Sequence, residues 1–292
     1  MGEPRFSRRT LLASIGAVGL TAAGVALKVS SSRTPLSEAI SPAGNIAASA
    51  KSPDVRVERV FSQARGRYVD LMLVLPGGVS TAKLPMSILL HGLHGDARHA
   101  ACGGLPQALN SAVARGTVPP FGFVAVDGGD HYWHENVAGD DPMKMLLDEV
   151  PGWLRERGLA EPFACTGVSM GGFGALLYAR RRLERGTPLG AVATIAPALI
   201  TSWTEMRKRR AFTNESVWAD MDPLKHLTAT GSTPVGVWIG DRDQFVGGAR
   251  RFIADVHPAV GHIGRGGHND DFYKTVTPDV VRFLGKHAKR AV

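Results

Sequence analysis

A serine flanked by glycines is the residue of this sequence with the clearest capacity for chemistry. Ser169 lies between Gly167 and Gly171 in the pattern G-x-S-x-G, which places a serine on a sharp turn between a strand and a helix. The glycines let the backbone bend tightly without clashes of Cβ atoms. Residues 163–166 are apolar enough for a buried strand, and residues 172–182 have apolar positions at helical spacing. This context predicts a nucleophilic serine on the turn.

The predicted nucleophile needs partners, because a serine hydroxyl is a poor nucleophile at neutral pH. A histidine base takes the hydroxyl proton, and a carboxylate orients that histidine. Asp243 follows the last clear strand, and His268 lies in a polar, glycine-rich loop further along the chain. Serine, acid and histidine in this order form a known triad arrangement. Asp241 remains a rival acid, and His257 and His262 remain alternative bases.

Attack by the serine on a carbonyl also requires hydrogen-bond donors for the oxyanion that develops. Met170 directly follows the serine, at the start of the predicted helix, so its backbone N–H is one expected donor. The segment LLHGL leaves a predicted strand and turns at Gly92. The next backbone amide, that of Leu93, is therefore the second expected donor.

The loop after the predicted strand 121–126 is long, polar and aromatic, and such loops at strand ends usually carry function. We expect Trp133 and His134 to contact the substrate. For Trp133 and its neighbour Tyr132, packing beneath the loop is an equally good interpretation.

Histidines and acids gather in two places, which raises the question of a catalytic metal. Neither group shows a helical zinc spacing such as H-E-x-x-H, and the first group lies in the predicted oxyanion loop. We therefore expect no metal and no other cofactor. The two groups are His91, His94 and His99, and Asp130, His131, His134 and Glu135.

The elements that must position these residues alternate between strands and helices. Such alternation predicts an α/β fold with a doubly wound, mainly parallel sheet. Residues 197–234 contain aromatic residues and a basic run, and predict a small cap of short helices. The other expected elements are a hairpin from 55–61 and 68–75, strands at 86–90, 121–126, 163–166, 191–196 and 235–239, and helices at 105–115, 142–157, 172–182, 245–256 and 278–289.

The composition fits a globular protein with one large core, since 44% of the 292 residues are hydrophobic and 21% are charged. The formal net charge is +8, but no basic run is interleaved with aromatic residues, so we expect no nucleic-acid partner. Apart from the run RKRR at 207–210, the basic residues are scattered. A basic surface suits a position near anionic envelope polymers or lipid headgroups, so envelope or membrane association is one expectation.

The N-terminal residues predict export. Arg8 and Arg9 directly precede an apolar stretch at 11–27, the arrangement of a twin-arginine signal or of an N-terminal membrane anchor. Either interpretation places the folded part outside the cytoplasm, and cleavage of the signal stays open. We therefore expect a signal or anchor in 1–27, a flexible linker in 28–54 and a catalytic domain in 55–292.

The two cysteines, Cys102 and Cys165, leave a choice between a disulfide and two thiols. Export permits a disulfide. Cys165 lies in the apolar run before the serine, where a buried thiol is common, so we favour two unpaired cysteines.

Several of these motifs together resemble one protein family. LLHGL, VDGGDHYWH, GVSMGG, GDRDQF and GGHNDDFY are similar to segments of the esterase D-like α/β-hydrolases, which include the exported mycolyltransferases. The resemblance extends from about residue 55 to the C-terminus. It implies an α/β-hydrolase fold and serine acyl transfer, with Ser169 as nucleophile, His268 as base, Asp243 as acid, and oxyanion amides from Leu93 and Met170.

One departure bears on the reaction. His91 stands where the mycolyltransferase segment LDGL has an acidic residue, so we place hydrolysis of a small-molecule or lipid ester ahead of acyl transfer. Transfer to a sugar or lipid hydroxyl of the cell envelope remains the alternative. A non-catalytic envelope-binding protein on a hydrolase scaffold is the contrasting class, because a fold alone does not guarantee activity.

Overall fold

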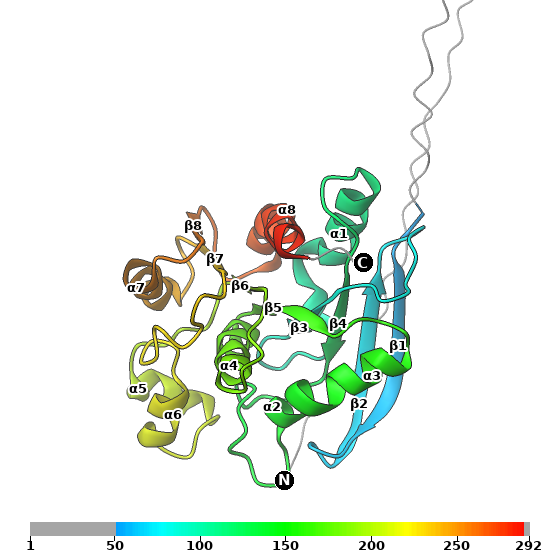
Figure 1. Cartoon of the computed structure of the whole chain (residues 1–292). Coiled ribbons are helices and arrows are strands. Elements are labelled where there is room, and N and C mark those ends of the chain that lie inside the picture. The colour runs from blue at the N-terminus through cyan, green and yellow to red at the C-terminus, as the bar shows by residue number, and fades with distance from the viewer. Residues whose placement is uncertain (1–50, 289–292) are drawn as a thin grey trace, which may run out of the picture. The chain divides into compact units, whose positions relative to one another are not determined.

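Eight strands form one sheet in the order β1-β2-β4-β3-β5-β6-β7-β8 in the computed structural model, which describes residues 51–288 (Figure 1). Strands β1 and β2 form an antiparallel hairpin, and β2 also runs antiparallel to β4. All other neighbouring pairs are parallel, so the predicted mainly parallel sheet is confirmed. The strands are β1 Asp54–Ser62, β2 Arg67–Leu75, β3 Met86–Leu90, β4 Gly122–Val126, β5 Pro162–Val168, β6 Ala191–Ile195, β7 Val235–Gly240 and β8 Val260–Gly264.

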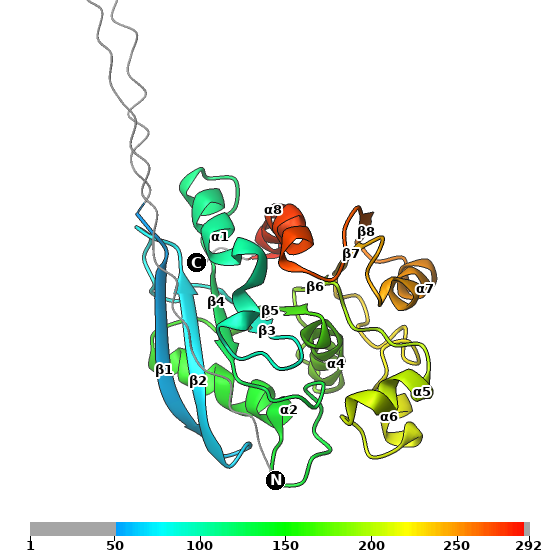
Figure 2. The same cartoon turned by 180° about the vertical axis from the view of Figure 1, so that it is seen from behind.

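Helices cover both faces of the sheet, which makes the fold doubly wound. Two α-helices and the 3₁₀ helix His99–Gly104 lie together on one face, and the other helices pack on the opposite face (Figures 1 and 2). Side chains of β3 alternate between the two cores: Ile88 belongs to one and Leu89 to the other, as the two-residue period of a strand requires. The first face carries α1 Leu105–Ala114 and α8 Asp270–His287; the second carries α2 Pro142–Lys144, the π-helix Met145–Glu149, α3 Val150–Glu156, α4 Met170–Glu184 and α7 Val246–Val256.

The segment 197–234 contains short helices, as predicted. They are α5 (Trp203–Met206), a 3₁₀ turn (Arg207–Arg209) and α6 (Glu215–Met221). The side chains of Ser202 and Asn214 accept hydrogen bonds from backbone N–H groups of the first turns of α5 and α6, the usual way to satisfy such donors.

Several elements differ from the expectation. The single helix expected at 142–157 is divided by the π-helix Met145–Glu149. Strand β8 occupies Val260–Gly264, where a loop was expected; it is a short edge strand rich in glycine and carries no fully buried side chain. Helix α8 begins at Asp270 because Asn269 caps it by accepting a hydrogen bond from the N–H of Phe272. Pro278, expected in the first turn, lies inside this helix.

The expected signal or anchor in 1–27 and nearly all of the expected linker in 28–54 lie outside the described residues. None of the helices in the described part of the chain is long and apolar enough to span a membrane. Cys102 and Cys165 are both free thiols in the structure.

Candidate active site

Ser169 occupies a strained turn between β5 and α4. Its backbone has φ 56° and ψ −119°, a conformation that costs energy in a residue with a Cβ atom and that is typical of functional sites. The flanking glycines are required by close packing: a Cβ atom on Gly167 would lie 1.9 Å from the carbonyl oxygen of Gly171, and one on Gly171 would lie 2.1 Å from that of Leu90. The turn therefore depends on the glycines that the sequence pattern singled out.

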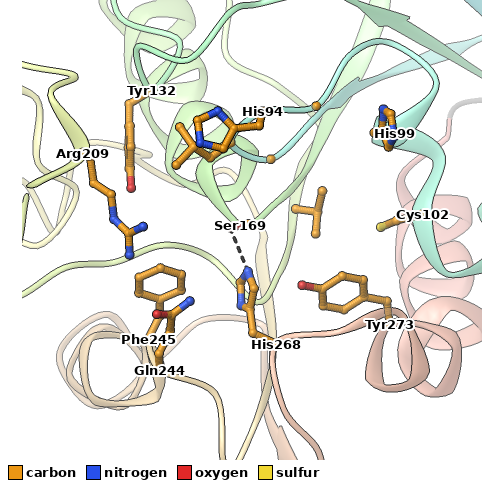
Figure 3. A pocket seen from close by; sticks show the side chains of 14 residues that line it. His94, His99, Cys102, Tyr132, Ser169, Arg209, Gln244, Phe245, His268 and Tyr273 are labelled. Atoms are coloured by element: carbon orange, nitrogen blue, oxygen red, sulfur yellow. Dashed lines mark hydrogen bonds between the residues drawn. The ribbon is translucent and has the colours of Figure 1, made fainter. Parts of the chain in front are cut away.

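A chain of hydrogen bonds connects Ser169 to a buried carboxylate. Nε2 of His268 lies 2.9 Å from Oγ of Ser169, and Nδ1 lies 2.7 Å from Oδ2 of Asp243 (Figure 3). The other carboxylate oxygen of Asp243 accepts a hydrogen bond of 2.8 Å from the N–H of Phe245. The Asp243 side chain is fully buried and that of His268 is partly exposed. The buried carboxylate therefore orients the imidazole toward Ser169, which lines a cavity.

The alternative acid and bases lie elsewhere. Asp241 is exposed and accepts a hydrogen bond from the backbone N–H of Gly266. His257 directly follows α7, and His262 lies on β8 with an exposed side chain. None of these three residues lines the cavity at Ser169. The structure thus brings together the favoured set and leaves the alternatives apart.

Two backbone amides beside Ser169 are free to bind an oxyanion. Met170 is the first residue of α4, where an N–H has no acceptor within the helix. Leu93 lines the cavity, in the loop that follows β3. Within residues 51–288, neither amide donates a hydrogen bond to another group. The positive end of the α4 dipole adds to the attraction for a negative oxygen.

His91 stabilises the loop that carries Leu93 through a contact from the buried side. This imidazole is fully buried, and its Nδ1 lies 2.8 Å from the carbonyl oxygen of Gly92. Burial lowers the pKa of His91, which keeps the ring neutral near pH 7. The ring also packs against Trp133, with 4.8 Å between the ring centres.

The structure corrects the roles expected for Trp133 and His134. Both side chains are buried and neither lines the cavity. Trp133 donates a hydrogen bond from Nε1 to the carbonyl oxygen of His91, and His134 stacks on Phe212 with Nε2 bonded to the carbonyl oxygen of Ala211. They cannot reach a substrate because the folded loop packs their rings into the core beneath it.

Two of the histidines considered for a metal pair with carboxylates instead. His94 contacts Asp130 through Nδ1 at 3.0 Å, and His99 contacts Asp96 through Nδ1 at 2.8 Å. No group of three histidine, cysteine, aspartate or glutamate side chains among residues 51–288 is arranged to hold a metal ion.

The cavity over Ser169 has a volume of about 370 Å³, in the range of small-molecule sites. Four of its residues were not among the predicted site residues: Arg209, Gln244, Phe245 and Tyr273. Tyr132, for which packing and a place in the substrate cleft were equally good interpretations, is largely buried and also lines the cavity. Burial raises the pKa of both Tyr132 and Cys102 to about 12, so these two groups stay protonated and neither competes with His268 as a base. The basic run at 207–210 was the one available signal for Arg209.

A comparison with protein families identifies the family of this chain. The family described as "Putative esterase" matches residues 62–253, and the predicted resemblance is confirmed. A search of curated proteins finds no match.

Three solved structures share the fold. A ferulic acid esterase has a TM-score of 0.69 at 17% identity, covering 82% of this chain and 99% of its own. An S-formylglutathione hydrolase from Agrobacterium tumefaciens has a TM-score of 0.64 at 15% identity, covering 82% and 96%. MPT51 (FbpC1) from Mycobacterium tuberculosis has a TM-score of 0.60 at 17% identity, covering 81% and 99%. The expected α/β-hydrolase fold is confirmed.

Proposed function

The chain belongs to the esterase family that matches residues 62–253, and from this premise we propose that it is an exported serine carboxylesterase acting on a small-molecule or lipid ester. One observation carries the proposal: an unbroken hydrogen-bond chain from Asp243 through His268 to Ser169. The amides of Leu93 and Met170, which donate no hydrogen bond within the described part of the chain, support the same reaction.

In the first half of the reaction, Oγ of Ser169 attacks the ester carbonyl while Nε2 of His268 takes the hydroxyl proton. The carbonyl oxygen becomes an oxyanion and accepts hydrogen bonds from the N–H groups of Leu93 and Met170. Collapse of this intermediate breaks the bond to the alcohol, which leaves with the proton from His268. The acyl group is now an ester of Ser169.

The second half returns the enzyme to its starting state. A water molecule gives a proton to His268 and attacks the acyl carbonyl, and the same two amides bind the second oxyanion. Collapse releases the acid, and the proton returns from His268 to Ser169. Throughout, Asp243 stabilises the imidazolium and holds its Nδ1–H, so that Nε2 faces the serine.

Export is part of the proposal and rests on Arg8 and Arg9 before the apolar stretch. An Arg8→Lys/Arg9→Lys double variant should remain in the cytoplasm, whereas the wild type should appear in the extracytoplasmic fraction. Equal export of both proteins would contradict the twin-arginine route. Envelope or membrane association is tested in the same fractions by washing them with high salt, which weakens contacts between opposite charges.

The enzymatic proposal is tested with purified full-length protein and short-chain 4-nitrophenyl esters. We expect steady release of nitrophenolate by the wild type and by Ser111→Ala, a control on α1, and no release above background by Ser169→Ala. Equal rates for the wild type and Ser169→Ala would contradict the proposal. Added acceptor alcohols distinguish the alternative, since an acyltransferase would form a new ester in place of the free acid.

A further inference from the structure

The cavity over Ser169 contains one arginine that the proposed reaction does not use. Arg209 ends the 3₁₀ turn after α5 and lines the same cavity as Ser169. Its Cζ atom lies 5.7 Å from the centre of the Phe245 ring, within the range of a cation–π contact. Figure 3 shows the guanidinium group between Tyr132 and Phe245, on the side of the cavity that faces His268. The charge thus lies in the wall of the cavity that Ser169 also lines.

This guanidinium has no acidic partner in the described part of the chain. No aspartate or glutamate there lies within salt-bridge distance of Arg209, although its neighbour Lys208 pairs with Glu205. The cavity lining contains no carboxylate at all among residues 51–288. The three histidines of the lining each contact a carboxylate that lies outside it: His94 contacts Asp130, His99 contacts Asp96 and His268 contacts Asp243.

An unpaired cation in a concave site has a physical consequence. Arginine keeps its charge at every physiological pH, and its planar group matches the two oxygens of a carboxylate. The low-dielectric wall formed by Phe245 and Tyr132 strengthens attraction for an anion relative to bulk water. The hydroxyl of Tyr132 and the amide of Gln244, both in the lining, are further donors for such a group.

We propose that Arg209 forms an anion subsite and that the preferred substrate of this enzyme is an ester bearing a carboxylate a few atoms from the scissile bond. The proposal rests on the esterase function and adds the class of substrate. A charged group held by Arg209 fixes one end of the substrate, which places the ester carbonyl over Ser169. Neutral esters of the same shape lack this contact.

The test compares acids with their methyl esters in two matched pairs. Mono-4-nitrophenyl glutarate and its methyl ester carry the difference on the acyl side, and 4-acetoxybenzoate and its methyl ester carry it on the alcohol side. Only cleavage of the phenyl ester is followed. In at least one pair, we expect the wild type to favour the acid by about tenfold or more in kcat/KM, the effect of a hydrogen bond to a charged group.

Variants distinguish a local contact with Arg209 from long-range attraction by the positive charge of the whole protein. Arg209→Gln should lose the preference, mainly through a higher KM for the acid, whereas Arg209→Lys should keep part of it. Arg207→Gln removes the same charge from an exposed neighbour that does not line the cavity, and should keep the full preference. Loss of preference in both glutamine variants would overturn a local subsite and indicate long-range attraction.

The wild type alone distinguishes the two proposals. Equal turnover of acid and methyl ester in both pairs would overturn the subsite and leave the esterase function standing, whereas no turnover of any ester would overturn both. A measurement without catalysis adds a second readout: calorimetric titration of Ser169→Ala with the favoured acid should show binding that is lost in Ser169→Ala/Arg209→Gln. Equal binding by these two proteins would overturn the subsite.

Discussion

The backbone N–H of Gly128 donates a hydrogen bond of 2.9 Å to Nε2 of His91. This contact fixes the tautomer, because an imidazole nitrogen that accepts a hydrogen bond carries no proton. Nδ1 must then hold the hydrogen and donate it to the carbonyl oxygen of Gly92. In a planar trans peptide the C=O and the next N–H point in opposite directions, so His91 directs the N–H of Leu93 away from itself.

His91 is therefore a positioning residue for the proposed oxyanion site. His91→Ala should lower kcat by at least about tenfold, since loss of one oxyanion donor typically costs more than that, with a smaller change in KM. His91→Asn, which keeps a nitrogen donor near the place of Nδ1, should retain more activity. Steady-state kinetics at pH 8, with melting temperatures to verify folding, provide the check. Unchanged kcat in folded His91→Ala would contradict the role.

Substitution of Asp243 or of Asp241 shows which of the two aspartates is the acid of the triad. Asp243→Asn should lower kcat by about 10³–10⁴-fold, because an amide no longer holds His268 in the required tautomer. Asp241→Asn is the matched control, since its carboxylate contacts only the loop backbone at Gly266 and a neighbouring arginine, and should keep nearly full activity. The reverse result would assign the acid to Asp241.

The stability of the fold should fall in mild acid because buried histidines resist protonation. Burial lowers the pKa of His134, whose Nδ1 accepts a hydrogen bond from the N–H of Asn136. As the pH falls below about 6.5, the ordinary pKa of histidine, His134 becomes protonated in the unfolded chain but stays neutral in the folded chain. The free energy of unfolding therefore falls as the pH falls through this range.

The measurement is the melting temperature of the wild type and of His134→Gln from pH 8 to pH 5. We expect the wild type to lose stability below about pH 6.5 and the variant to lose less, because it lacks His134. The variant should still lose some stability, because His91 and other groups contribute in both proteins. Parallel curves for the two proteins would show that His134 has no part in the acid response.

Trp133 should affect stability rather than substrate binding. Trp133→Phe leaves part of the site unfilled and removes the donor to the carbonyl oxygen of His91, so we expect a loss of about 1–3 kcal/mol in the free energy of unfolding. KM for 4-nitrophenyl butyrate should change little. Chemical denaturation and steady-state kinetics measure the two effects. A large change in KM with unchanged stability would contradict this role and support the substrate contact expected from the sequence.

The residues around Ser169 were predictable because each is tied to a local pattern. Gly167 and Gly171 mark the turn, Asp243 follows a clear strand, and His268 lies in a polar, glycine-rich loop after that acid. The cavity wall was not predictable in the same way: Arg209 and Tyr273 come from separate segments that only the folded sheet and its helices bring together.

The wrong expectations have physical causes as well. Trp133 and His134 lie in a polar loop that resembles a substrate loop in composition, but the loop folds its aromatic rings inward. Strand β8 is short and glycine-rich, so no alternation of apolar residues revealed it. The start of α8 was missed because Pro278 is more common in the first turn of a helix than inside one.

The central claim is a covalent intermediate on Ser169, and peptide mapping by mass spectrometry tests it most directly. Full-length wild-type protein treated with a fluorophosphonate should carry one phosphonyl group, located on the peptide that contains Ser169, and should lose its esterase activity in the same proportion. Ser169→Ala should remain unmodified. A phosphonyl group on another residue, or inactivation without modification of Ser169, would contradict the account.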